Sequence, residues 1–164
     1  MGYTAKDVSN TIDDVSYLLE ELDALGRVID AVPVSDRPTG TDSVYDMLDR
    51  IKHAQNAYYF PLVKNLFAKP IPKIQIPDYN ESFKRSDNFL TVEQLLTEIK
   101  VERRELINFL NKLPQEDFIT KGEVNGVEVA IIELMNHMVV FERSQLKEVA
   151  ERVLSIEPQL GKRD

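Results

Sequence analysis

The sequence contains no cysteine and only two histidines, and both shortages limit its chemistry. Without cysteine the chain forms no disulfide and no thiolate zinc site, and it has no cysteine nucleophile. Histidine is then the usual nitrogen ligand for a transition metal, so any such chemistry depends on His53 and His137. Neither histidine has a glutamate three residues before it, which excludes the Glu-x-x-His pairs of carboxylate-bridged di-metal bundles.

Glycine and long apolar runs are also scarce. The six glycines form no phosphate-binding loop, and no Gly-x-Ser-x-Gly nucleophile turn occurs. No run approaches the about 18 apolar residues of a membrane span, and the N-terminus lacks the apolar core of a signal peptide. We therefore expect a cytoplasmic protein, and the nucleotide-binding and serine-hydrolase interpretations have no support.

Acidic residues outnumber basic ones by 28 to 20, which gives a net charge of −8 and a pI near 4.9. Such a chain is repelled by phosphate backbones and by anionic lipid surfaces. The composition therefore predicts no nucleic-acid partner and no membrane partner. A length of 164 residues is typical of one domain, so we expect a single domain over residues 1–164.

Four segments repeat apolar residues with the 3.6-residue period of an amphipathic helix. They span residues 5–31, 43–68, 91–113 and 128–155. Four such helices bury their apolar stripes most simply against one another, so the predicted fold is all-α, a four-helix bundle. The methionines of these stripes, Met47, Met135 and Met138, are expected to fill the core.

Local signals mark the helix starts and one interruption. Thr91 with Gln94 resembles a capping box at the start of the third helix, and Thr41 or Asp42 could cap the second. Pro61 lies inside the second helix and removes one hydrogen bond, so a kink is expected at about residues 57–61.

The two long connections differ in character. Residues 69–89 contain three prolines and no sustained period, which predicts an extended crossover long enough for the second and third helices to run parallel. Residues 114–128 look irregular, although Asn125-Gly126 could form a two-residue hairpin turn.

Charged residues inside the apolar stripes are the remaining chemical signal. At 100° per residue, Glu142 lies about 20° from the stripe of its helix and Arg103 about 40° from its own. A buried carboxylate without a partner is costly, so a structural ion pair between Glu142 and Arg103, or snorkelling of these side chains at the bundle end, is favoured over a role in an active site.

The order and spacing of several short motifs resemble the DinB-like family of four-helix bundles, which is related to thiol-dependent transferases and isomerases. The segments that carry the resemblance are residues 42–44 and 47–51, the long crossover, residues 113–118, Gly126, and residues 133–138, 141–143 and 145–146. Together they span nearly the whole chain.

The resemblance implies a divalent metal held by three side chains, usually histidines, one on the second helix and two on the fourth. In this chain those positions fall on Arg50, Phe141 and Gln145, none of which is a normal ligand in such a site. Helix geometry places all three on the flanks of their stripes, and it places His53 and His137 on the outer surface. We therefore expect neither a metal nor another cofactor at the family position.

Two hypotheses of function follow. In the first, the protein is a DinB-like bundle without the family metal site, and it binds a small ligand or a protein or acts structurally. The candidate ligand-binding residues are Arg50, Phe141, Gln145, Glu142 and Arg103. In the second, it is a divalent-metal-dependent enzyme, such as a thiol-linked transferase, that uses His53 and His137 with a carboxylate such as Glu142.

A homodimer is also expected. The resemblance implies pairing through bundle helices, and the second and fourth helices carry more apolar residues than one narrow stripe uses. The additional residues are Tyr45, Tyr59, Val63, Phe67, Val140 and Phe141.

Overall fold

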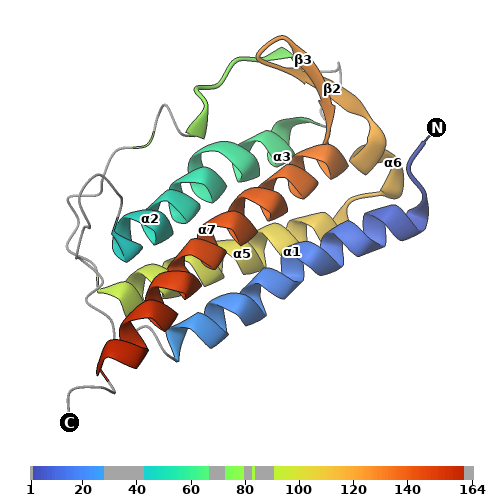
Figure 1. Cartoon of the computed structure of the whole chain (residues 1–164). Helices are drawn as coiled ribbons and strands as arrows, with labels where there is room; N and C mark the ends of the chain where they lie inside the picture. The colour runs from blue at the N-terminus through green and yellow to red at the C-terminus, as the bar shows by residue number, and fades with distance from the viewer. Residues whose placement is uncertain (1, 28–42, 67–72, 80–82, 84–90, 161–164) are drawn as a thin grey trace.

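The computed structural model of the chain describes residues 2–27, 43–66, 73–79, 83 and 91–160. Its long helices form a four-helix bundle, so the all-α bundle predicted from the sequence is confirmed (Figure 1). The bundle consists of α1 (Ala5–Gly26), α2 (Val44–Ala54) continued by the π-helical segment η2 (Gln55–Tyr59) and α3 (Phe60–Leu66), α5 (Val92–Lys112) and α7 (Ile131–Leu160). The α2–α3 unit and α5 run in the same direction, as expected from the long crossover, and α1 and α7 run in the opposite direction.

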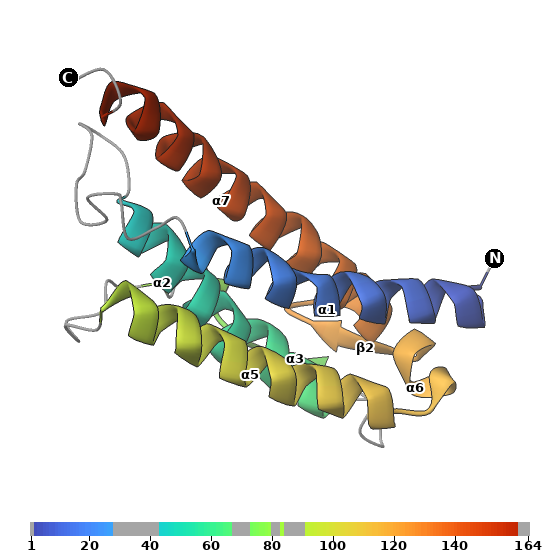
Figure 2. The ribbon, with the colours of Figure 1, turned by 90° about the horizontal axis from the view of Figure 1, so that it is seen from below.

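Each of α1 and α2 packs against both α5 and α7, which closes the bundle around one core, and Figure 2 shows the same arrangement from below. Core side chains come from all four helices. The side chains with no exposed surface include Val15, Leu18, Leu48, Ile51, Leu95, Ile99, Met135 and Met138. Met47 is 2% exposed, so the expectation that the stripe methionines fill the core is confirmed.

Reciprocal side-chain caps begin three of the helices. The predicted cap at Thr91 is confirmed, since the Thr91 hydroxyl accepts from the Gln94 N–H at 3.1 Å and the Gln94 side chain accepts from the Thr91 N–H at 2.9 Å. The predicted cap at Thr41 or Asp42 is wrong, because Ser43 takes this role with Asp46. The carboxylate of Asp46, three residues after Ser43, accepts from the Ser43 N–H and so completes the capping box.

The second helix contains a π-helical turn close to the predicted kink. Pro61 has no backbone N–H and so cannot donate a helical hydrogen bond. The N–H of the preceding Phe60 donates to the carbonyl of Gln55, five residues back, which is the π-helical pattern; in an α-helix it would donate to the residue four back. The irregularity predicted near residues 57–61 therefore takes the form of η2 at Gln55–Tyr59.

Two helix boundaries differ from the prediction. The first helix ends at Gly26, and residues 28–31 of the predicted span lie outside the described residues. The last helix begins at Ile131 instead of residue 128, because residues 127–130 form a strand, and it continues to Leu160.

The segment predicted to be irregular is ordered. It forms the short helix α6 (Gln115–Ile119) and an antiparallel hairpin of β2 (Lys121–Val124) and β3 (Val127–Ala130). The hairpin turn at Asn125-Gly126 is confirmed, with φ of 52° and 83° at its two residues, as a type I′ turn requires. The turn residues thus allow Val124 to pair with Val127 and start the ladder.

The crossover contributes a third strand to this hairpin. Residues of β1 (Lys73–Ile74) pair in parallel with β2, with Ile74 opposite Val124. This part of the crossover is extended, as predicted, and its pairing with the hairpin was not foreseen. Residues 69–72, 80–82 and 84–89 lie outside the described residues. Among the described helices, none combines the length and the apolar character needed to cross a membrane.

The Asn125 side chain holds the crossover to the hairpin. Its Oδ1 accepts from the Ile76 N–H at 2.9 Å, and its Nδ2 donates to the Ile76 carbonyl at 2.8 Å. The Asn125 N–H also donates to the Ile74 carbonyl at 2.9 Å. Asn125 thus fixes both the hairpin turn and the position of the crossover beside it.

Replacing Asn125 by alanine is expected to lower the free energy of unfolding by about 2 kcal/mol, because alanine loses both side-chain bonds and is strained at positive φ. Asn125→Gly loses the same bonds without the backbone strain and should cost about 1 kcal/mol. Urea unfolding followed by circular dichroism measures both. Equal losses in the two variants would contradict the role given to the backbone conformation.

Candidate ligand-binding cleft

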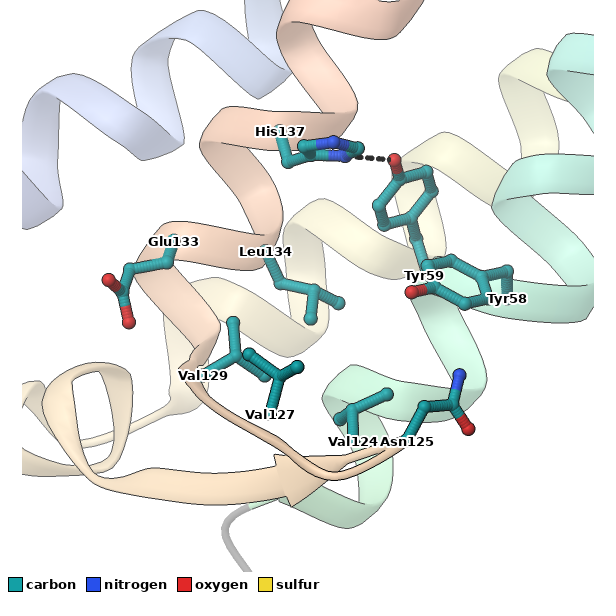
Figure 3. Close-up of a pocket in the computed structure, with 9 residues that line it drawn as sticks. All are labelled: Tyr58, Tyr59, Val124, Asn125, Val127, Val129, Glu133, Leu134 and His137. Carbon is teal, nitrogen blue, oxygen red and sulfur yellow. Dashed lines mark hydrogen bonds between the residues drawn. The ribbon is translucent and has the colours of Figure 1, made fainter. Parts of the chain in front are cut away.

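A cleft of about 400 Å³ opens between η2, the β2–β3 hairpin and the first two turns of α7 (Figure 3). This volume lies within the usual range of small-molecule sites, about 300–1,000 Å³. Nine described residues line it: Tyr58, Tyr59, Val124, Asn125, Val127, Val129, Glu133, Leu134 and His137. The cleft therefore depends on the hairpin and on the π-helical turn together.

Valines of the hairpin and one leucine supply the apolar wall. Val127 and Val129 are two residues apart on β3 and so project from the same face of the strand. Val124 on β2 pairs with Val127, and Leu134 adds its side chain from α7 (Figure 3). The wall therefore follows from the strand period and from the register of the hairpin.

The polar end of the cleft is a hydrogen-bonded pair, Tyr59 and His137. The Tyr59 Oη lies 2.6 Å from the His137 Nδ1. Tyr59 has no exposed surface, and burial together with a hydrogen bond to Tyr79 raises the pKa of the Tyr59 hydroxyl far above its ordinary value. Burial of the Tyr59 hydroxyl therefore favours its protonated form.

Two aromatic rings pack against the ring of Tyr59. Its ring centroid lies 4.9 Å from that of Tyr58 and 5.4 Å from that of Tyr79, which the crossover supplies. Tyr79 in turn contacts Phe141 on α7, with 4.7 Å between the ring centroids. Edge-on and tilted ring pairs of this kind are stabilising, so the polar end of the cleft is rigidly supported.

Glu133 and Asn125 are the other polar residues of the cleft. The half-buried Glu133 accepts from the Ala130 N–H at 2.9 Å, which satisfies one free donor at the start of α7. Both polar ends of the Asn125 amide bond to the Ile76 backbone. The Glu133 carboxylate also bonds to Tyr3 and points away from the other lining residues in Figure 3. The Asn125 amide has two N–H groups, and the bond to the Ile76 carbonyl uses one of them.

The two histidines lie in different settings. His137 is exposed, as predicted. The same prediction is wrong for His53, which is half-buried, because the side chain of Phe83 from the crossover packs edge-on against its ring at a centroid distance of 5.7 Å. Burial lowers the pKa of His53.

Arg50, Phe141 and Gln145 are half-buried, and none of them lines the cleft. The Arg50 guanidinium lies 4.5 Å from the centroid of the Phe83 ring, so its aromatic partner belongs to the crossover. The hypothesis that these three residues bind a ligand stays a prediction.

The predicted ion pair between Arg103 and Glu142 is confirmed, and it lies in the core instead of at a bundle end. Arg103 has no exposed surface and Glu142 is 1% exposed. Arg103 also donates through Nε to Gln55 Oε1 at 2.6 Å and through Nη1 to the Val15 carbonyl at 3.4 Å. Burial raises the pKa of the Glu142 carboxyl, and the charge and hydrogen bond of Arg103 oppose this rise.

The residues present do not fit the metal that the family resemblance implies. Arg50 carries a permanent positive charge that repels a divalent cation, Phe141 has no lone pair, and Gln145 offers only an amide oxygen. Across the described part of the chain, no cluster of three or more histidine, aspartate or glutamate side chains is arranged to hold a metal ion.

Sequence reasoning missed the cleft because its residues come from separate segments. The apolar pattern predicts a second face that includes Tyr59 and Val63, yet both are fully buried in the bundle's own core. The Asn125-Gly126 turn was the available signal, since a hairpin at that point brings its valines to the start of the last helix.

The fold and the cleft together define a four-helix bundle with parallel α2–α3 and α5 and a ligand-sized cleft beside a small sheet. Among solved structures, the same fold occurs in YfiT from Bacillus subtilis, described as a probable metal-dependent hydrolase with an unusual four-helix bundle topology. The two structures superpose with a TM-score of 0.79 over 94% of this chain and 90% of YfiT, at 11% sequence identity. The predicted DinB-like fold is thereby confirmed. No protein-family model matches the sequence, and no curated protein matches it.

Proposed function

We propose that this protein is a small-molecule-binding module on a DinB-like bundle and that it holds no metal at the family position. The observation that carries the proposal is the cleft of about 400 Å³, whose apolar wall ends at the polar pair of Tyr59 and His137. Apolar walls with a few convergent polar groups are typical of small-molecule sites.

The alternative is a divalent-metal-dependent enzyme, which the description of YfiT favours. It would use His53, His137 and Glu142. In this chain His137 is bonded to Tyr59, the His53 ring packs on Phe83, and Glu142 is paired with Arg103 inside the core. Glu142 is therefore committed to its buried pair with Arg103, which supports the ligand-binding proposal, whereas the bond at His137 Nδ1 does not use the Nε2 of that ring.

Binding in the cleft can be tested with Val127→Trp, which fills the cleft from a position that is 66% exposed and so does not disturb the core. We expect indole and benzamide, titrated into ¹⁵N-labelled protein, to shift the amide signals of the cleft residues. Val127→Trp should weaken this binding at least tenfold. The matched control is Val101→Trp, on an exposed position of α5 that does not line the cleft, and it should leave binding unchanged.

Two results would contradict the proposal. The first is binding that Val127→Trp does not weaken. The second is near-stoichiometric nickel or zinc in tag-free protein that is lost in His53→Ala and His137→Ala and kept in Arg50→Ala, which would establish the metal-dependent alternative. Mass-spectrometric metal analysis of the purified protein measures this content.

Homodimer formation stays a proposal, with a narrower basis than the sequence suggested. Burial of Tyr59 and Val63 in the bundle removes two residues from the expected second face. Val140 on α7 remains 69% exposed and Phe141 half-buried, so a dimer would pair through this part of α7. A cytoplasmic location is likewise proposed from the sequence.

A further inference from the structure

Asn125 is the only asparagine in the sequence that is followed by glycine. In such a pair the backbone nitrogen of the glycine can attack the side-chain carbonyl carbon of the asparagine, because glycine has no Cβ to hinder the approach. Both residues are exposed at the tip of the β2–β3 hairpin. We propose that Asn125 is a deamidation site, that residues 73–76 of the crossover hold it in an unreactive conformation, and that its modification releases these residues from the hairpin.

The reaction consumes one water molecule and releases ammonia. The Gly126 nitrogen, after losing its proton to hydroxide, forms a bond to Asn125 Cγ. The bond between Cγ and Nδ2 breaks, and the leaving nitrogen takes a proton from water and departs as ammonia. Water then adds to one of the two carbonyl carbons of the succinimide ring. Ring opening gives aspartate or isoaspartate at position 125, without any oxidation or reduction.

The conformation of the hairpin turn opposes ring closure. The ring requires an Asn125 ψ of about −120°, which brings the Gly126 nitrogen to the side of Cβ, whereas the first residue of a type I′ turn has a ψ of about +30°. The φ angles of 52° at Asn125 and 83° at Gly126 belong to that turn. While the turn is formed, the Gly126 nitrogen therefore points away from the side chain that it would attack.

Three hydrogen bonds to the crossover hold Asn125 in this conformation. Its amide accepts from the Ile76 N–H at 2.9 Å and donates to the Ile76 carbonyl at 2.8 Å. Its backbone N–H donates to the Ile74 carbonyl at 2.9 Å. Rotation of the side chain toward Gly126 breaks both amide bonds, so the reaction requires an opening of the contact between the hairpin and the crossover. The rate of deamidation therefore reports how often this contact opens.

The product cannot restore the contact. A carboxylate has no N–H, so the bond to the Ile76 carbonyl is lost, and two oxygen acceptors then face each other across the former 2.8 Å bond. They repel each other, since neither carries a proton. Isoaspartate also adds one methylene group to the backbone, which a two-residue turn does not accommodate. Because water does not convert the product back to asparagine, the release proceeds in one direction.

Peptide mapping by mass spectrometry measures the reaction in the full chain at pH 7.5 and 37 °C. A synthetic peptide of residues 121–130, too short for a stable hairpin, gives the unprotected rate. We expect Asn125 to deamidate at least about tenfold more slowly in the folded protein than in the peptide. Ile76→Pro removes the N–H that Asn125 binds and should raise the rate at least about fivefold above that of the control Ile76→Ala, which keeps this N–H.

Hydrogen exchange of the Ile76 amide measures the release. Asn125→Asp carries the side chain of the product, and we expect the Ile76 amide to exchange at least about fivefold faster in this variant than in the unmodified protein. The control Asn111→Asp adds the same charge at an exposed position of α5 and should leave the exchange of Ile76 unchanged. This measurement also decides the matter if Ile76→Pro does not fold.

Three results would overturn the proposal. Deamidation as fast in the folded protein as in the peptide would show that the turn gives no protection. Equal rates in Ile76→Pro and Ile76→Ala would show that the crossover does not control the reaction. An Ile76 amide that exchanges equally slowly in Asn125→Asp and in the unmodified protein would show that the modification releases nothing.

Discussion

Arg103→Met is expected to lower the free energy of unfolding by about 3–5 kcal/mol, because it leaves the buried carboxylate of Glu142 without its counter-charge. Arg103 has no exposed surface, so water cannot replace the missing guanidinium without opening the bundle. Gln55 Oε1 loses its bond from the arginine in the same variant. Urea unfolding followed by circular dichroism measures the loss.

A double variant separates the ion pair from the packing. Arg103→Met with Glu142→Leu removes both charges and should recover most of the lost stability, since apolar residues often replace a buried ion pair with little cost. An equal loss in the single and the double variant would show that packing, and not the unpaired charge, explains the effect.

The pH dependence of Arg103→Met gives a second measurement. Without the arginine, burial and the negative charge of Glu21 both act on Glu142, and its pKa in the folded state rises further above the unfolded value. The folded state then holds the proton more tightly than the unfolded state, so stability falls as the pH rises above about 4.3, the ordinary value for glutamate. The variant should be less destabilised at pH 5 than at pH 8.

Phe118→Ala is expected to cost about 3–5 kcal/mol, the usual penalty for emptying a large buried ring site. Phe118 is 1% exposed and lies on α6, which packs against α7. The neighbouring Ile119 is 38% exposed, so Ile119→Ala is the matched control and should cost less than about 1 kcal/mol. Similar losses in the two variants would show that α6 is not anchored through Phe118. Thermal and urea unfolding of both variants give the comparison.

The sequence alone determined those features that depend on contacts along one helix or on neighbouring residues. The apolar period predicted four helices, Thr91 with Gln94 predicted a cap, and the angle of 100° per residue placed Glu142 and Arg103 inside the bundle. Each of these is local, since a helix sets the direction of its side chains by its own geometry. The Asn125-Gly126 turn belongs here too, because its backbone preference is a property of two adjacent residues.

Only the tertiary structure decided which segments meet. The hydrogen bond between Tyr59 and His137 joins residues 78 positions apart, and the hydrogen bond between Asn125 and Ile76 joins residues 49 positions apart. No period along the chain encodes such contacts, because they depend on how the crossover and the hairpin pack on the bundle. In the apolar pattern of its helix, Tyr59 is additional to the main stripe. It becomes the buried support of a cleft because Tyr58, Tyr79 and His137 surround it in the folded chain.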